Sequence, residues 1–104
     1  MDRIEYSLQY LLLFEQDLAA VRHYIECILQ NPHAALQLIE DTERAIYKRL
    51  ANPISFEPVR STRNRKHPYY SIYIRNYMVL YVVIDNVMEV RRFVYSKRDL
   101  TKLI

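Results

Sequence analysis

The stretch Tyr69–Tyr95, YYSIYIRNYMVLYVVIDNVMEVRRFVY, decides the fold of this chain. It contains three strand-like runs separated by two short polar breaks. The middle run, Tyr77–Ile84, has no polar side chain apart from tyrosine hydroxyls and is rich in β-branched and aromatic residues. This composition predicts a central strand that is buried on both faces. The next run, Val87–Tyr95, predicts a second strand, but it carries two adjacent arginines, Arg91 and Arg92.

The two breaks predict tight hairpin turns made without glycine. The chain has 104 residues and no glycine, which is the residue that normally supplies positive φ angles in two-residue turns. Asparagine is the next best residue for such angles. Arg75-Asn76 and Asp85-Asn86 stand at the two breaks. We therefore expect the stretch to fold as an antiparallel meander.

Upstream of the meander we expect one strand and two helices. Apolar and polar residues alternate in the segment Ile4–Tyr10, which predicts a strand. From Leu11 the apolar period becomes helical, and this first helix should end near Gln30. Asn31-Pro32 combines a good N-cap with a residue preorganised for the first helical position, so a second helix should run from there to about Leu50.

Each predicted helix has one apolar face, and the sheet is the only surface on which both can pack. The face of the first helix consists of Phe14, Leu18, Val21, Ile25 and Ile28. The face of the second consists of Ala35, Leu38, Ile39, Thr42, Ala45, Ile46 and Leu50. Cys27 lies near the first stripe and is expected to be a small buried side chain.

The remaining segments complete an α+β domain that spans residues 1–104. Residues 51–68 predict a loop, with a short strand around Phe56–Val59. Residues 97–104 predict a short helix or an ordered tail, and Leu100, Leu103 and Ile104 are expected to pack back on the core. The expected architecture is a helical hairpin on one face of a mostly antiparallel sheet, with the other face free.

Charge and composition restrict the classes of function. Residues 1–57 hold five Lys/Arg and nine Asp/Glu, whereas residues 58–104 hold ten Lys/Arg and three Asp/Glu. Either the basic half meets a negative partner, such as nucleic acid or an acidic peptide, or its charges decorate exposed edges and loops. One cysteine excludes an internal disulfide and a cysteine-based zinc site, and the lack of glycine argues against a phosphate-binding glycine loop. No apolar run is long enough for a membrane helix, so we expect a soluble, cytoplasmic protein without metal or cofactor.

Three segments resemble the RelE/ParE family of bacterial toxins from type II toxin–antitoxin systems. They are NPHAALQLIEDTERAIYKRLANP (31–53), YYSIYIRNYMVLYVVIDNVMEV (69–90) and RRFVYSKRDL (91–100). The resemblance implies the fold predicted above. It also implies an antitoxin partner, whose segments wrap the helices and the sheet and cover the basic face.

The family divides by target. RelE-like members cleave messenger RNA on the ribosome, whereas ParE-like members poison DNA gyrase. Our first hypothesis is a ribosome-dependent, metal-independent mRNA endoribonuclease. The alternatives are a non-enzymatic gyrase poison that binds through the helical hairpin and the tail, and a degenerate toxin that acts only as a binding module in a repressor complex.

The resemblance also points to site residues. Arg98 and Arg92 match positions where the family commonly has an arginine, and Tyr95 falls where some members have a catalytic histidine, so these three residues are our catalytic candidates. Arginine suits the stabilisation of an extra negative charge on phosphate, and tyrosine suits proton transfer. The family pattern is incomplete, because Met78 stands where many members have an arginine, and Ser71 and Tyr73 stand where the best-known RNases have lysines.

Each assignment has a structural alternative. Arg92 could instead form an ion pair on the sheet with Glu89 or Asp99, and Tyr95 could be a packing residue at the rim. Tyr73 either stacks on an RNA base or packs against the helices. The basic residues either contact RNA phosphates or are solvated. The residues expected to bind RNA are Arg60, Arg63, Arg65, Lys66, Tyr73, Arg75 and Lys97.

Overall fold

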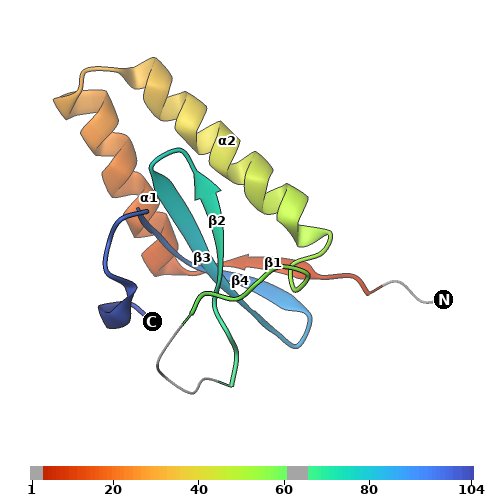
Figure 1. The fold of residues 1–104 in the computed structure, drawn as a ribbon. Helices are drawn as coiled ribbons and strands as arrows, with labels where there is room; N and C mark the ends of the chain where they lie inside the picture. Colours follow the sequence, from red (N-terminus) through yellow and green to blue (C-terminus); the bar gives the residue numbers. More distant parts are fainter. Residues whose placement is uncertain (1–3, 61–65) are drawn as a thin grey trace.

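Strand β3 (Tyr77–Ile84) lies inside a four-stranded sheet of order β1-β4-β3-β2 in the computed structural model of the protein, which describes residues 4–60 and 66–104. It pairs antiparallel with β2 (Tyr70–Ile74) on one side and with β4 (Val87–Tyr95) on the other. The predicted meander and its buried central strand are therefore confirmed. Strand β1 (Ser7–Tyr10) adds a parallel pairing to β4, so the sheet is mixed (Figure 1).

Both hairpin turns lie at the predicted positions, but the backbone angles of the first turn differ from expectation. In the second turn Asp85 and Asn86 both have positive φ, at 50° and 63°. In the first turn the positive φ of 53° belongs to Arg75 rather than to Asn76. An arginine adopts this region at some cost, because its Cβ crowds the backbone. The pairing of the flanking strands and the ion pair of Arg75 described below hold it there.

The helical hairpin covers one face of the sheet, as predicted (Figure 1). Helix α1 (Leu12–His23) continues into a π-helical turn, η1 (Tyr24–Ile28), and α2 spans Pro32–Leu50. The Asn31 side chain caps α2 by accepting a hydrogen bond from the Ala34 N–H at 3.1 Å. The pair Asn31-Pro32 thus correctly predicted both the capping residue and the start of the helix.

The turn η1 overturns two predictions made from a regular helical period. The Leu29 N–H donates to the Tyr24 carbonyl, five residues earlier, at 3.1 Å. A π-turn holds more residues than an α-helical turn, so the side chains that follow it rotate away from the apolar stripe. Ile28 is consequently 64% exposed. Cys27 is exposed as well, with its Sγ 3.6 Å from His23 Nδ1.

The main core lies between the hairpin and the sheet. From α2 it includes Ala35, Leu38, Thr42 and Ile46, which are buried, as the predicted stripe required. From α1 only Phe14 is buried. Burying one such large apolar side chain contributes about 1.5–3 kcal/mol.

The other face of the sheet is covered, which corrects the expectation of a free face. We call the residues after β4, 96–104, the tail, and the sheet face under them, made by Met78, Leu80, Val82 and Val94, the tail face. The tail contains a short 3₁₀ turn, η2 (Leu100–Lys102), and ends on Ile104, which is 5% exposed. Leu100, Leu103 and Ile104 all join this second core, as predicted. The face is closed because its strand side chains are apolar and need a cover.

One predicted strand boundary and one predicted strand are wrong. The first strand begins at Ser7 rather than Ile4, because its partner segment on β4 begins at Val87 and leaves earlier residues no strand to pair with. No strand forms in the segment Phe56–Val59. There, the Val59 N–H donates a 2.7 Å hydrogen bond to the Tyr69 carbonyl.

Candidate functional site

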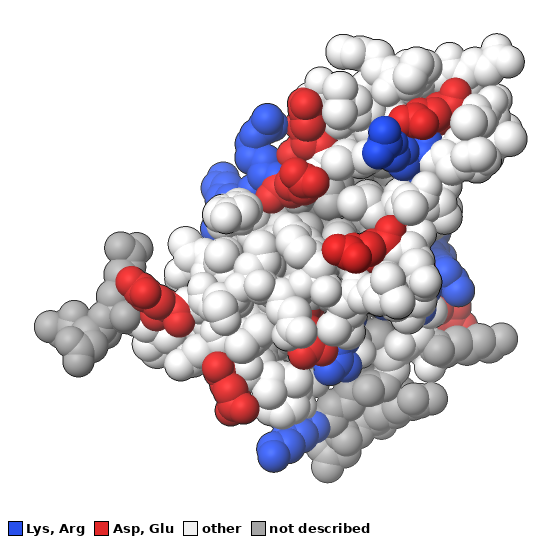
Figure 2. All heavy atoms as spheres, turned by 180° about the vertical axis from the view of Figure 1, so that it is seen from behind, with Lys and Arg blue, Asp and Glu red and all other residues white. Residues whose placement is uncertain are grey.

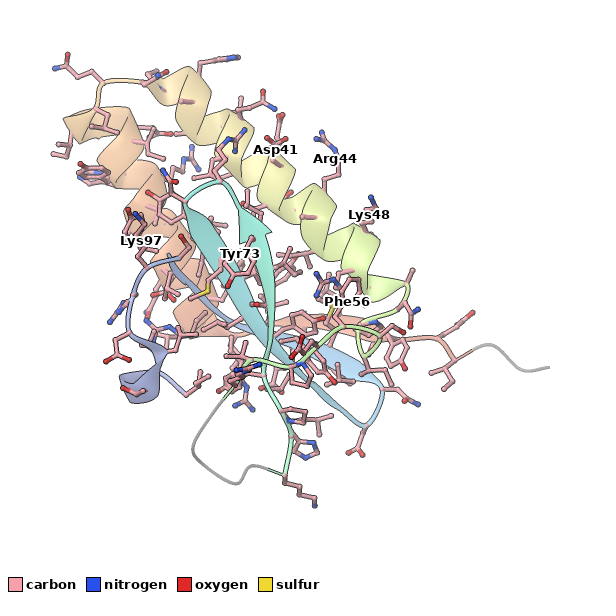
Figure 3. The ribbon with its side chains drawn as sticks, viewed as in Figure 1. Asp41, Arg44, Lys48, Phe56, Tyr73 and Lys97 are labelled. Atoms are coloured by element: carbon pink, nitrogen blue, oxygen red, sulfur yellow. The ribbon has the colours of Figure 1, made fainter. Side chains whose placement is uncertain are left out.

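Five of the predicted site residues lie at the end of the sheet that holds the β2–β3 turn, with Tyr73 and Tyr95 on opposite faces of the sheet. The Ser96 N–H donates to the Asn76 carbonyl at 2.8 Å, which brings the start of the tail to this turn. We call the group the sheet-end site. Its members are Tyr73, Arg75, Tyr95, Lys97 and Arg98. Figure 3 shows Tyr73 on β2 and Lys97 just after β4.

Side chains at the sheet-end site are open to solvent. Tyr73 is 67% exposed and Tyr95 is 48% exposed, so neither is a core tyrosine. The Tyr95 ring makes an edge contact with the ring of Tyr77, with centroids 6.2 Å apart. In the described part of the chain, no hydrogen bond or ion pair occupies the side chains of Lys97 and Arg98. These groups can contact a partner, as a binding role requires.

Arg75 is shared between this site and α2. Its guanidinium forms an ion pair with Asp41, which also accepts a hydrogen bond from Arg44 at 3.0 Å. The side-chain hydrogen bond from Arg75 lowers the pKa of Asp41 below its ordinary value. Figure 3 shows Asp41, Arg44 and Lys48 along one side of α2. Asp41 thus ties the β2–β3 turn to the helix and neutralises part of the local positive charge.

Arg92, the first catalytic candidate, is engaged elsewhere. Its Nε and Nη2 donate to the two carboxylate oxygens of Asp17 at 2.7 and 3.1 Å. The same carboxylate accepts the Phe93 backbone N–H at 3.0 Å. The side-chain hydrogen bond to Asp17 raises the pKa of Arg92 further. The alternative of an ion pair is therefore what the geometry shows, although the partner is Asp17 of α1 and neither Glu89 nor Asp99.

The position of Asp17 has a structural reason. Strand β1 pairs with β4 only as far as Val90, so the outer edge of β4 beyond that point lacks a neighbouring strand. Helix α1 lies along this edge, and Asp17 satisfies the backbone donor of Phe93 there. A buried or half-buried N–H needs such a partner. No local sequence signal pairs residue 17 with residue 92, so this function of Asp17 was missed.

Arg91 has separate partners on the sheet. Its Nε donates to Glu89 at 2.8 Å and its Nη1 to the Tyr69 hydroxyl at 3.0 Å. The β3–β4 register shifts next to this residue, because Leu80 pairs with Arg92 whereas Tyr81 pairs with Val90. This irregularity is a β-bulge that leaves Arg91 without an opposite residue. The guanidinium of Arg91 is therefore occupied on the sheet.

The predicted basic run of the long loop lies away from the sheet-end site. Arg60 and Lys66 are exposed and stand near the start of β2, whereas the sheet-end site lies at the end of that strand. Arg63 and Arg65 fall outside the described residues. An RNA contact by this run stays a prediction.

Met78 illustrates how the tail face differs from an open catalytic surface. It is 1% exposed and belongs to the apolar core beneath the tail. An arginine at this position would have to leave water or displace the tail, and burying an unpaired charge is very costly. The methionine therefore fits a face that is filled with apolar side chains.

Arg49 and Tyr81 form a second contact network that the sequence did not reveal. Arg49 Nη1 donates to the Tyr81 hydroxyl at 2.9 Å and to the Ser71 carbonyl at 3.3 Å. The Tyr81 hydroxyl donates to the Pro53 carbonyl at 2.6 Å. The Phe56 ring stacks on the Arg49 guanidinium, with 3.5 Å between Cζ and the ring centroid. This network holds the segment after α2 and occupies the open edge of β2.

A shallow groove of about 260 Å³ runs between the two helices. Leu18, Ala19 and Ile39 form its apolar part, and Glu15 and Glu43 flank it. Arg22 also lines it, but its charge is paired with Glu26. Figure 2 shows that acidic side chains are scattered over a largely uncharged rear face of the molecule. We call this the interhelix groove; its shape and charge suit an apolar side chain from a basic segment.

Neither a cluster of metal ligands nor a membrane-crossing helix is found in the described part of the chain. Residues 4–60 and 66–104 contain no group of three His, Cys, Asp or Glu side chains that could hold a metal ion. No helix within the same residues is both long and apolar enough to cross a membrane.

Comparison with known proteins places these features in context. Residues 8–100 match the family described as ParE toxin of type II toxin-antitoxin system, parDE. The chromosomal ParDE TA system from P. aeruginosa contains a similar chain, with a TM-score of 0.67 and 18% identity over 92% of this chain and 100% of that one. The archaeal RelE-RelB complex from Pyrococcus horikoshii OT3 gives a TM-score of 0.52 and 14% identity over 90% of this chain and 98% of that one. No curated protein matches the sequence.

Proposed function

The chain belongs to the ParE toxin family of type II toxin–antitoxin systems, and from this premise we propose that it is a non-enzymatic poison of DNA gyrase that a cognate antitoxin neutralises. The observation that carries the proposal is the state of Arg92. The Nε and Nη2 of Arg92, which form the side-on fork that could bind a phosphate in a bidentate manner, are hydrogen-bonded to Asp17. A catalytic arginine would need that fork for the substrate.

Further support comes from the surroundings of the other catalytic candidates. Cleavage of RNA requires a base, an acid and a group that stabilises the negative charge of the transition state. Arg98 lies in the tail, beyond the last strand, and Tyr95 contacts a neighbouring tyrosine ring. Met78 and the tail fill the second face of the sheet with apolar atoms. A protein-binding toxin needs none of these catalytic groups.

The test compares the two kinds of toxicity directly. Purified toxin is added to DNA gyrase in a supercoiling assay, and mRNA from induced cells is examined by primer extension. We expect inhibited supercoiling, a DNA-damage response in cells and no codon-linked cuts in mRNA. Codon-linked cuts without gyrase inhibition would contradict the proposal. Absence of any growth inhibition would instead favour a degenerate toxin that serves as a binding module.

A ribosome-dependent RNase remains the second candidate, because of the exposed groups at the sheet-end site. Tyr73 could stack on a base, and Lys97 and Arg98 could contact phosphates. Tyr95→Phe separates the two functions, since it keeps the aromatic ring and removes the hydroxyl group that could transfer a proton. A gyrase poison should keep full toxicity in this variant, whereas an RNase that uses the hydroxyl should lose its mRNA cuts.

We further propose that the antitoxin binds the interhelix groove. The similar solved structures are of a ParDE TA system and a RelE-RelB complex. The groove offers apolar contacts between two glutamates, Glu15 and Glu43, so it suits a segment that carries lysine or arginine beside apolar side chains. Ile39→Gln should weaken co-purification of the antitoxin. Equal recovery of the antitoxin with Ile39→Gln and with the unsubstituted toxin would show that the antitoxin binds elsewhere.

A further inference from the structure

A second groove lies where the bend of the helical hairpin meets the β2–β3 turn. Its volume is about 420 Å³. Ile25, Leu29 and Leu38 supply its apolar part, and His33 and Arg75 stand among its polar lining residues. We call it the bend groove. Its volume falls within the range of sites that bury a ligand group or an anchoring side chain.

Apolar side chains at the bend of the helical hairpin are unusually exposed, and one of them, Leu29, lines the bend groove. Leu29 itself is 55% exposed, and near it in the sequence Tyr24 is 49% and Ile28 is 64% exposed. The π-turn η1 accounts for the exposure of Ile28, because it rotates this side chain out of the predicted apolar stripe. The main core is already complete without them. Exposed apolar side chains grouped around a groove are typical of a surface that binds a protein.

The charge of the bend groove indicates the kind of partner. None of its lining residues is Asp or Glu. Arg75 and His33 line it. Arg75 shares the Asp41 carboxylate with Arg44, so these three side chains together keep a net positive charge. The N-terminus of α2, which carries a partial positive charge, also opens onto the groove. A second copy of the chain would bring the same basic groups face to face, and like charges oppose such a contact. An acidic partner segment is therefore favoured.

We propose that the bend groove seats a bulky apolar side chain from an acidic segment of the protein that the toxin poisons. This inference rests on the proposed function, because it takes the target to be a protein and, in the first instance, DNA gyrase. The antitoxin is assigned to the interhelix groove, whose flanking glutamates call for the opposite charge. The surface proposed to bind the target and the surface proposed to bind the antitoxin thus differ in position and in the sign of their charge.

Leu29→Gln tests the apolar contact, with Leu12→Gln as the matched control. Leu12 is 67% exposed and lies at the other end of α1, so both substitutions put the same amide at an exposed position. We expect Leu29→Gln to weaken gyrase inhibition and growth inhibition roughly tenfold or more, as for a hot-spot side chain. Leu12→Gln should behave as the unsubstituted toxin. Melting temperature and antitoxin co-purification report whether each variant is folded.

Charge substitutions at His33 test the acidic character of the partner. His33 is exposed and is the second residue of α2. Glutamate is favourable there for the helix, whereas lysine is not, because the helix N-terminus is positive. An acidic partner predicts the reverse order for toxicity: His33→Glu should weaken it and His33→Lys should keep it. If His33 acted only through the stability of the helix, His33→Lys should be less toxic than His33→Glu.

The readouts separate this inference from the proposed function. If the toxin inhibits gyrase and the Leu29 and His33 variants inhibit it equally well, the groove assignment is wrong and the proposed function stands. Should the toxin stop growth without inhibiting gyrase, the proposed function fails, and growth inhibition by the variants then decides whether the groove binds another target. Loss of antitoxin binding with full toxicity would assign the groove to the antitoxin and overturn the inference.

Discussion

Replacement of Asp17 by asparagine should destabilise the protein severely although it changes few atoms. The carboxylate of Asp17 both neutralises Arg92 and accepts a hydrogen bond from the Phe93 N–H. The side chains of Arg92 and Asp17 are only 18% and 16% exposed, so water replaces the lost contacts poorly. Asparagine cannot neutralise the guanidinium, and its amide donors would face other donors.

The magnitude follows from the burial of the pair. Removing one partner of a fully buried ion pair costs about 3–5 kcal/mol, and the remaining exposure places this pair near the lower end. Weakening the hydrogen bond to the Phe93 N–H adds to the loss. We therefore expect a loss of about 3 kcal/mol in the free energy of unfolding. For a domain of this size that corresponds to a fall in melting temperature of roughly 12–24 °C.

Thermal unfolding followed by circular dichroism measures the effect, with Glu26→Gln as the control. Glu26 pairs with Arg22 on the same helix, but there the side chains are 32% and 57% exposed. Such a pair contributes at most about 1 kcal/mol. If Asp17→Asn melts within a few degrees of Glu26→Gln, the reasoning is refuted. Adding Arg92→Leu to Asp17→Asn should recover part of the loss, because it removes the stranded charge.

Three further predictions concern other contacts. Tyr81→Phe should cost about 1–3 kcal/mol in urea unfolding, because its buried hydroxyl donates to the Pro53 carbonyl at 2.6 Å. Arg75 lowers the pKa of Asp41 below 3.8, so this ion pair stabilises the fold above that pH and is lost as pH falls through the lowered pKa. The melting temperature of Asp41→Asn should accordingly depend less on pH in the acid range. Ile104→Ala should cost roughly 2 kcal/mol by thermal melting, since Ile104 is 5% exposed on the tail face; an unchanged melting temperature would contradict its place in the core.

The elements with strong local signals were predictable. Each of these signals acts over a few residues, and the structure confirms them. They are the change of the apolar period between strand and helix, the Asn31-Pro32 cap and the two polar breaks in the meander. The resemblance to the toxin family rested on the same segments, and the match over residues 8–100 confirms it. Where local geometry departs from the regular period, as in η1, the predicted burial of Ile28 and Cys27 failed.

The sequence predicted only part of the candidate site. The sequence indicated the residue types at the sheet-end site, and the pairing of β2, β3 and β4 brings them together. It did not indicate which arginine is free. Arg92 and Arg98 are equally basic in the sequence, yet one is bonded to a carboxylate 75 positions away and the other is exposed.

The sequence by itself determined the order of the elements, the buried central strand Tyr77–Ile84 and the charge of each half of the chain. These follow from side-chain periodicity and composition, which need no knowledge of distant contacts. Only the tertiary structure decided that the tail closes the second face of the sheet, that Asp17 occupies Arg92, and that the bend groove is open. Each of these depends on which side chains meet across the fold, and burial and ion pairing are set by that meeting rather than by neighbours in the chain.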